Sequence, residues 1–354
     1  MGPVYLFGPV IGFNPRGPIR TDDSFTVLLI YVDDIVLTGD NVAEIQRVKH
    51  ALDSQFRIKD MGSLRFFLGL EISRNKSGIA VNKRKYAFEI LSDTGLLGAK
   101  PSSTPMVPSL HLSHTNGTLL SDGDALSYRR LIGRLLYLTT TCPDIYFSVQ
   151  QLSQFVGAPT STHRVAATRV LRYIKGTPAT GLFFPSHKSL QLSGFTNLDL
   201  ACCPDTRRSI TGLCIFLGSS FIGWRSKKQP IVSRSSSEAE YRALATMTCK
   251  LQWITYILRD LCVPCSTVAH VYFDNISAIC LAKNPTLHEH SMHIEIDIHV
   301  TREKLQVGLL WLFPATSYDQ LADIFTKALH PSSYFSIIAK LGLRDVHCPA
   351  CEGC

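Results

Sequence analysis

Two adjacent carboxylates between two apolar runs are the feature that most constrains the fold of this chain. Residues 27–30 and 35–37 are apolar, and Asp33 and Asp34 lie between them. Apolar runs that flank a short polar step are typical of a tight β-hairpin. Adjacent acids at its tip would suit a hard cation such as Mg²⁺. An ordinary surface turn with solvated acids is the alternative, and the wider sequence favours the cation site.

Further sequence blocks follow this segment. They read FRIKDMG at 56–62, FFLGLEI at 66–72, CPDI at 142–145, LRYIKGT at 171–177, SKKQ at 226–229 and SSEAEY at 236–241. Together with LLIYVDDIVLTGD at 28–40, and in this order, the blocks resemble the Pol polyprotein of copia-type LTR retrotransposons. The resemblance runs from the middle of the reverse transcriptase to the end of RNase H, over roughly residues 24–343.

The resemblance implies an α+β chain of several parts. Its RNase H-like domain should be α/β, with a mixed five-stranded sheet. The expected parts are an N-terminal extension outside the family (1–23), a partial reverse transcriptase palm (24–100), a linker and helical thumb or connection (101–185), the RNase H-like domain (186–332) and a C-terminal tail (333–354).

Residue patterns predict individual elements within these parts. Helical spacing of apolar residues covers 42–56, and glycines punctuate a hairpin with strands at 64–68 and 70–73. The Pro-, Ser- and Thr-rich segment 101–124 is typical of a linker that crosses the surface. Beyond it, we expect a helix-rich block at 125–173, strands at 190–196, 212–217, 221–225, 269–273 and 309–313, and helices at 237–260 and 320–329.

The family pattern assigns metal-binding acids to the RNase H-like part. Glu240 lies one turn inside the long helix, Asp274 ends the strand at 269–273, and Asp323 opens the last helix. Hydrolysis with two metal ions needs several carboxylates to hold Mg²⁺ or Mn²⁺ roughly 3.5–4 Å apart. The resemblance therefore implies two ions and three of the four expected acids.

The fourth acid is missing. The family reads Gly-Tyr-x-Asp-x-Asp-Trp-Ala at the first strand, and Asn197 stands where the acid bridges both ions. An amide offers one neutral oxygen and no negative charge. Asp199 lies farther along the same side of the strand, so we do not expect it to substitute. We therefore expect RNase H activity to be weak or absent.

The reverse transcriptase part lacks an acid as well. Asp33 and Asp34 match the catalytic, metal-binding hairpin of the family, but only 32 residues precede Asp33 and none is an acid in the family's Asp-Val-x-x-Ala-Phe context. We expect no polymerase activity from this chain. The segment 66–69 resembles the grip on the primer strand. Lys59 could donate a proton to departing pyrophosphate, or it is a solvated surface lysine.

The charge balance suits a polyanionic partner. The 354 residues contain 36 Lys and Arg against 28 Asp and Glu, a net charge of +8. The resemblance implies an RNA/DNA hybrid or another nucleic acid as partner, with metal as the only cofactor. Solvated basic faces are the alternative to phosphate contacts. The candidate nucleic-acid-binding residues are Arg164, Arg169, Arg172, Lys175, Lys227 and Lys228.

The lack of a recognisable signal peptide and the cysteine usage indicate a reducing compartment. The apolar segment 209–224 is broken by glycines, so we expect no membrane span, and the N-terminus lacks the basic region of a signal peptide. The family location in virus-like particles implies a cytoplasmic or nuclear protein that is not secreted, with its eleven cysteines reduced. The tail residues His347, Cys348, Cys351 and Cys354 have zinc-like spacing, and either adventitious metal binding or a bland tail fits them.

Two further departures from the family pattern are Leu200 in place of Trp and Cys142 in place of Arg. They are typical of a decaying element. Three interpretations therefore stay open: a Pol fragment with weak or absent catalysis, a noncatalytic nucleic-acid-binding remnant, and a pseudogene product.

Overall fold

The computed structural model describes residues 4–7, 19–21, 24–186, 189–263, 268–283 and 295–345. It divides into two compact units. Unit 1 comprises Met1–Ser73 with Ile254–Cys265, and unit 2 comprises Arg74–Trp253 with Ser266–Cys354. Each unit is described by itself.

Unit 1 is built on the predicted hairpin. Strand β3 (Ser24–Tyr31) pairs with β4 (Asp34–Gly39), and Tyr31 lies opposite Asp34. The N-terminal segment, for which the sequence predicted no element, adds two strands to the sheet. The sheet order is β2-β3-β4-β1-β5, with β1 at Val4–Phe7, β2 at Ile19–Thr21 and β5 at Lys59–Ser63.

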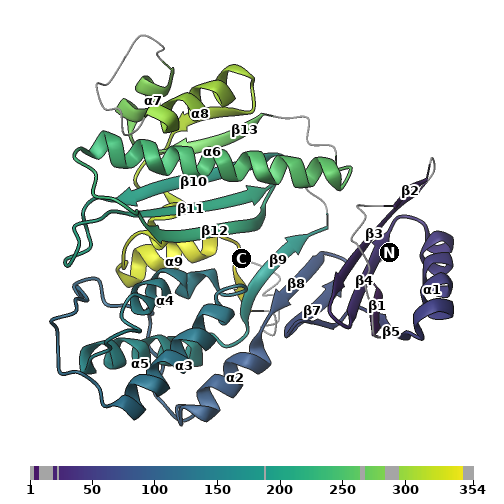
Figure 1. Cartoon of the computed structure of the whole chain (residues 1–354), viewed down its shortest axis with the longest axis horizontal. Coiled ribbons are helices and arrows are strands. Elements are labelled where there is room, and N and C mark those ends of the chain that lie inside the picture. The colour runs from purple at the N-terminus through teal and green to yellow at the C-terminus, as the bar shows by residue number, and fades with distance from the viewer. Residues whose placement is uncertain are drawn as a thin grey trace. The chain divides into compact units, whose positions relative to one another are not determined.

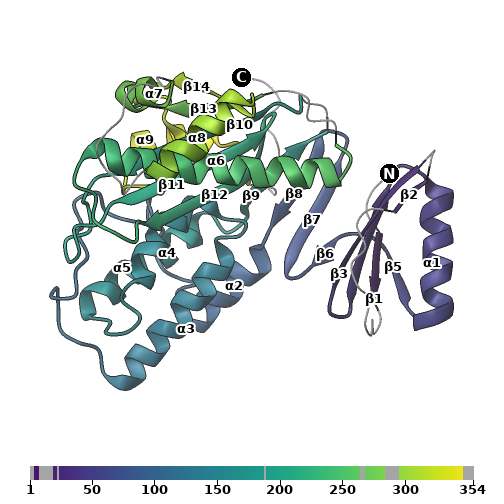
Figure 2. The same ribbon diagram turned by 45° about the horizontal axis from the view of Figure 1, so that its top comes forward.

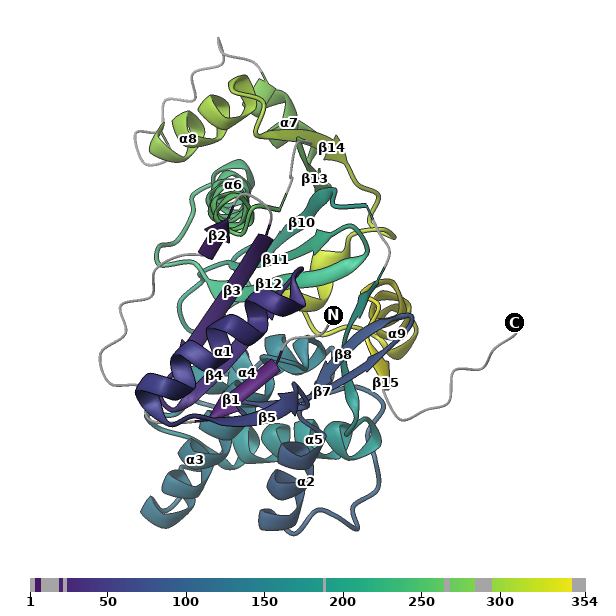
Figure 3. The same ribbon diagram turned by 90° about the vertical axis from the view of Figure 1, so that its right-hand side faces the viewer.

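Helix α1 (Val42–Phe56) confirms the predicted helix of unit 1. The Asn41 side chain accepts the N–H groups of residues 43 and 44, which caps its first turn. Ile45, Val48 and Leu52 recur on one face and pack with Ile35 and Leu37 of β4. Figure 3 shows α1 lying over β3 and β4.

The predicted second hairpin is also present. Strand β6 (Phe66–Phe67) pairs with β7 (Leu70–Asn75), and Phe67 lies opposite Leu70. Leu68 and Gly69 turn the chain with φ of 49° and 72°. Strand β6 is shorter than the predicted 64–68.

Unit 2 contains the expected helix-rich block. Figure 2 shows its helices lying side by side, and they share one apolar core. They are α2 (Arg84–Asp93), α3 (Asp122–Leu138), the 3-10 helix η1 (Pro143–Ile145), α4 (Tyr146–Ser153) and α5 (Ser161–Gly176).

The segment 101–124 is not the surface linker that its composition predicts. Met106 and Leu112 are only 4% and 6% exposed and belong to the core of unit 2. Arg169 Nη2 donates a hydrogen bond to Thr104 Oγ1 at 3.0 Å, and Arg172 Nε donates to the carbonyl of Lys100 at 2.7 Å. The two apolar side chains and two arginines fix this segment against the helices.

Unit 2 also contains a mixed five-stranded sheet, as predicted (Figure 1). Its order is β12-β11-β10-β13-β14. Strands β10, β11 and β12 are antiparallel neighbours, whereas β13 and β14 run parallel to β10. Their bounds are β10 Leu192–Asp199, β11 Ile210–Leu217, β12 Ser220–Lys228, β13 Ala269–Phe273 and β14 Leu310–Pro314.

The two faces of this sheet are covered differently. The predicted long helix, α6 (Ser236–Asp260), lies on one face, and the 3-10 helix η2 (Leu321–Phe325) lies on the other (Figure 3). Gly212 of β11 makes the second contact possible. A Cβ atom there would lie 2.6 Å from Thr326 Cγ2 and 2.8 Å from the carbonyl oxygen of Ala322. A glycine therefore lets η2 approach the sheet closely.

The predicted helix at 320–329 is wrong in extent. The chain forms η2 and then a separate helix, α9 (Pro331–Lys340). Proline lacks an N–H and disfavours helical geometry in the residue before it, so α9 starts anew at Pro331. Asp323 therefore lies inside a short 3-10 helix and does not open a long one.

The remaining elements complete unit 2. Strand β9 pairs with β8 and β15. No helix in the described part of the chain is both long enough and apolar enough to span a bilayer. These last elements are β8 (Gly78–Asn82), β9 (Thr180–Pro185), β15 (Arg344–Asp345), α7 (Ile276–Lys283) and α8 (Glu295–Gln306).

Candidate functional site

An acid cluster lies where the parallel strands β10 and β13 end. The last paired residues are Phe195 and Tyr272, so Asn197 and Asp274 each lie two residues beyond the paired stretch. The Asp274 carboxylate interacts with that of Asp323. The Asn197 Nδ2 group donates a hydrogen bond to Asp323 Oδ1 from η2. The structure therefore brings together three of the positions that the family pattern singles out.

Glu240 of α6 joins this cluster through Asp274. Burial raises the pKa of Glu240, the Asp274 carboxylate adds to the rise, and a hydrogen bond with Asn275 opposes it. Burial also raises the pKa of Asp274, and the Asp323 carboxylate adds to that rise. Burial is the largest cause of both shifts, and a neighbouring carboxylate adds to each.

Lys327 is a member of the cluster that the sequence did not reveal. Its Nζ lies 2.9 Å from Asp323 Oδ2. Its charge lowers the pKa of Asp274 and of Asp199, against the rise that burial causes in both. The spacing of four residues between Asp323 and Lys327 is the sequence signal that could have indicated the pair.

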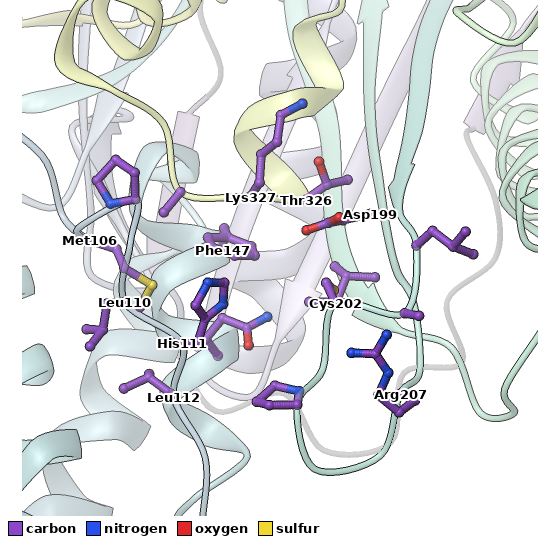
Figure 4. Close-up of a pocket in the computed structure, with 17 residues that line it drawn as sticks. Met106, Leu110, His111, Leu112, Phe147, Asp199, Cys202, Arg207, Thr326 and Lys327 are labelled. Atoms are coloured by element: carbon purple, nitrogen blue, oxygen red, sulfur yellow. The ribbon is translucent and has the colours of Figure 1, made fainter. Parts of the chain in front are cut away.

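Asp199 faces a cavity of about 530 Å³ in unit 2. Burial raises its pKa, and a hydrogen bond with Cys202 opposes the rise. Figure 4 shows Asp199 beside Thr326 and Cys202, with Met106 across the cavity. Lys327 lines the same cavity, which therefore adjoins the acid cluster.

The cluster does not fit the two metal ions that the family pattern implies. Asn197, Glu240, Asp274 and Asp323 would be the ligands. Both oxygens of Asp323 already face nitrogen donors, and Asn197 Oδ1 accepts the backbone N–H of residue 198 at 2.7 Å. Among the described residues, no group of three His, Cys, Asp or Glu side chains is placed to hold a metal ion.

A cationic cavity of about 240 Å³ lies at the end of β12. Lys227 and Arg225 are exposed there. Lys228 also lines it, and its Nζ is 3.7 Å from Cys203 Sγ. Arg242 of α6 lines the opposite wall and forms an ion pair with Glu238 at 2.8 Å. These side chains provide cations at the end of β12.

The α5 arginines hold protein acceptors. Arg164 pairs with Asp124, and Arg169 and Arg172 hold the segment 100–104 as described above. Burial lowers the pKa of Arg169. The three arginines line a cavity of about 630 Å³ and retain further N–H donors, because a guanidinium has five. Lys175 lies half-buried in the last turn of α5.

The hairpin acids belong to unit 1. Asp33 is exposed in the turn, and Asp34 begins β4. Lys59 is exposed at the start of β5. The tail with His347, Cys348, Cys351 and Cys354 lies outside the described residues.

The sheet of unit 2 has antiparallel strands on one side and parallel strands on the other, and acidic positions lie at the ends of its two parallel central strands. This arrangement defines an RNase H-like domain.

Comparison with known proteins gives the family. Residues 19–108 match the model of the reverse transcriptase (RNA-dependent DNA polymerase) family. The chain is 38% identical over 328 residues to the retrovirus-related Pol polyprotein from transposon RE1 of Arabidopsis thaliana. The aligned region covers 93% of this chain and 22% of the polyprotein. The chain therefore belongs to the Pol polyproteins of copia-type LTR retrotransposons.

Two other similarities concern shorter proteins and a solved structure. The uncharacterized mitochondrial protein AtMg00810 of Arabidopsis thaliana is 42% identical over 226 residues, which cover 64% of this chain and 93% of that protein. A foamy viral protease-reverse transcriptase in complex with dsDNA aligns with a TM-score of 0.47 and 13% identity, over 82% of this chain and 55% of that one. The chain spans about a fifth of the length of the transposon polyproteins that it matches.

Proposed function

We propose that this chain is a reverse transcriptase and RNase H region of Pol that binds an RNA/DNA hybrid but cleaves its RNA strand weakly or not at all. The observation that carries the proposal is the state of Asp323. One oxygen accepts the Asn197 amide and the other holds the Lys327 ammonium. A metal ion at this carboxylate would have to compete with two nitrogen donors.

The cations of unit 2 support hybrid binding. Asn197 lies opposite Gly212, and Gly212 lies opposite Ser226, the residue before Lys227. Adjacent strands are about 4.8 Å apart, so the end of β12 lies about 10 Å from the acid cluster. Lys227 follows Ser226 and so points to the opposite face of the sheet, where it lines a cavity with Arg225 and Arg242 of α6. A nucleic-acid backbone that passes around this edge of the sheet can contact these cations. Phosphate contacts from such cations do not depend on an intact metal site.

The test measures binding and cleavage separately. A labelled RNA/DNA hybrid is titrated with the protein in EDTA at several salt concentrations, and fluorescence anisotropy gives the affinity. We expect affinity to fall as salt rises, because each phosphate contact releases about 0.9 counterions on B-form DNA. Replacing Arg225 and Lys227 together by Gln should weaken binding and flatten the salt dependence by about two contacts.

The matched control is Lys76→Gln, in the exposed turn between β7 and β8. It removes one positive charge far along the chain from the cluster and should leave the salt dependence nearly as it is. Absence of binding in EDTA would refute the proposal. Efficient cleavage of the RNA strand by the parent protein in Mg²⁺ would refute its second half.

A further inference from the structure

Lys327 lies at the edge of the acid cluster. It follows η2 and is 46% exposed at its side chain, whereas the Asp323 side chain that it contacts is 14% exposed. A half-exposed ammonium therefore contacts a mostly buried carboxylate of the cluster. Neither the family pattern nor the residue spacing had assigned it a role.

The Lys327 ammonium lies near acids from two segments. Its Nζ is 2.9 Å from Asp323 Oδ2, and Lys327 lines the same cavity as Asp199. These acids come from η2 and from the end of β10. Two separate segments thus lie beside a cation that the chain itself provides.

The Asn197 amide completes the arrangement on the other side of Asp323. Its Nδ2 donates to Asp323 Oδ1, while its own oxygen accepts a backbone N–H. A divalent ion binds carboxylate oxygens directly. An ion bound to Asp323 would have to compete with the amide and the ammonium for its oxygens, and it would lie next to a like charge.

We propose that Lys327 is the resident cation of the acid cluster and excludes Mg²⁺ and Mn²⁺ from it. The exclusion should persist when Asn197 alone is replaced by Asp, because the new carboxylate lies against Asp323 and pairs with the same ammonium. This inference rests on the proposed function for the identity of the site. It adds the residue that excludes metal ions from that site.

The test titrates Mn²⁺ into the whole chain without nucleic acid and follows free Mn²⁺ by electron paramagnetic resonance. Every protein in the test carries Asp33→Asn and Asp34→Asn, so that the hairpin acids of unit 1 cannot provide the site. The variants are Asn197→Asp, Lys327→Met and the two combined. Parent and Asn197→Asp should show no saturable site. The combined variant should bind at least about tenfold more tightly than Asn197→Asp, since changes around a metal site typically alter affinity 10–100-fold.

Lys340→Met is the matched control. Lys340 forms an ion pair of the same length, 2.9 Å, with Asp319, outside the cluster. Combined with Asn197→Asp, it should give no gain in Mn²⁺ affinity. Circular dichroism and thermal melts establish that each variant is folded.

Three results would overturn the inference. They are a saturable Mn²⁺ site in the parent, a site in Asn197→Asp as tight as in the combined variant, and no site in the folded combined variant. Because nucleic acid is absent, this test can fail while hybrid binding in EDTA succeeds, and the reverse also holds.

A second measurement follows the parent and needs Asn197→Asp only to assign one signal. The Asn197 side-chain amide gives a proton–nitrogen NMR signal, identified by its loss in Asn197→Asp. Mn²⁺ strongly broadens nuclei near it. We expect this signal to stay sharp as Mn²⁺ is added, and selective broadening at low Mn²⁺ would refute the exclusion.

Discussion

Replacing Lys83 by Met should change how the stability of unit 2 depends on pH. Lys83 is only 2% exposed. Its Nζ donates hydrogen bonds to the carbonyl of Tyr137 at 2.9 Å and to Thr140 Oγ1 at 2.7 Å. Burial lowers its pKa from 10.5 to about 8, with Cys142 opposing the shift.

The sign of the effect follows from proton binding. Between pH 8 and 10.5, the unfolded chain holds the Lys83 proton and the folded chain has lost it. The free energy of unfolding therefore rises with pH across this window. At 1.36 kcal/mol for each pKa unit, the interval corresponds to about 3 kcal/mol. Below pH 8, the cost of burying the charge is fully present. In Lys83→Met this pH dependence is absent.

Chemical unfolding from pH 7 to 10.5 measures the effect. Trp224 is a suitable probe, because its Nε1 donates to the carbonyl of Thr139 at 3.1 Å, next to the Lys83 partners. The exposed Trp253 and Trp311 are replaced by Phe so that Trp224 alone reports. The difference in free energy of unfolding between parent and variant should change by about 3 kcal/mol over this range.

The exposed Lys76→Met provides the control and should follow the parent at every pH. A difference between parent and Lys83→Met that stays constant with pH would show that Lys83 keeps its ordinary pKa. The reasoning from burial would then be wrong.

Three further predictions concern the two units. Asn197→Asp combined with Lys327→Met should cleave a labelled RNA strand in a hybrid at least about tenfold faster than the parent in Mg²⁺; an equal rate would mean that other lesions block the site. Tyr173→Phe should lower the free energy of unfolding by about 1–3 kcal/mol, because the Tyr173 hydroxyl donates to the buried Asp144 at 2.6 Å. Adding Asp144→Asn should recover part of that loss in melts, and no recovery would contradict the assignment. The 354-residue polypeptide should not extend a primer, and template-dependent incorporation that Asp33→Asn abolishes would refute this.

The sequence predicted those elements whose side chains repeat. Ile45, Val48 and Leu52 recur with a helical period, and α1 follows them from Val42 to Phe56. Strand β13 has the predicted bounds, because its residues alternate between buried and half-buried positions. The 3-10 helix η2 has five residues, four of them buried, so no period longer than one turn was available to define it.

The sequence also did not predict the burial of single apolar side chains in the segment 101–124. The segment 101–124 is rich in turn residues, and nothing periodic marks Met106 and Leu112 as buried. Their burial depends on the surface that the helices of unit 2 present. Composition describes the average of such a segment and cannot indicate which single side chains find a partner.

Motifs located the positions of the candidate site but not their contacts. Asn197 and Asp323 are 126 residues apart, and only the packing of η2 against Gly212 brings them together. Asn197 by itself suggests that one substitution would return an intact site. The ion pair between Asp323 and Lys327 changes that expectation, because it places a second nitrogen on the same carboxylate.

A similar change of charge occurs at Cys142, where the family pattern has Arg. Burial raises the pKa of this thiol, and the neighbouring Asp144 adds to the rise, so the side chain stays neutral. One oxygen of Asp144, Oδ1, is buried without a hydrogen-bond partner among the described residues. The other, Oδ2, accepts a hydrogen bond from the Tyr173 hydroxyl. Here the departure removes a cation from beside a buried acid, and a neighbouring hydroxyl supports the carboxylate. At Asn197 the departure removes an acid, and the remaining Asp323 is satisfied by an amide and an ammonium. In both places the substitution alters the charge balance of a carboxylate while the surrounding strands and helices are present.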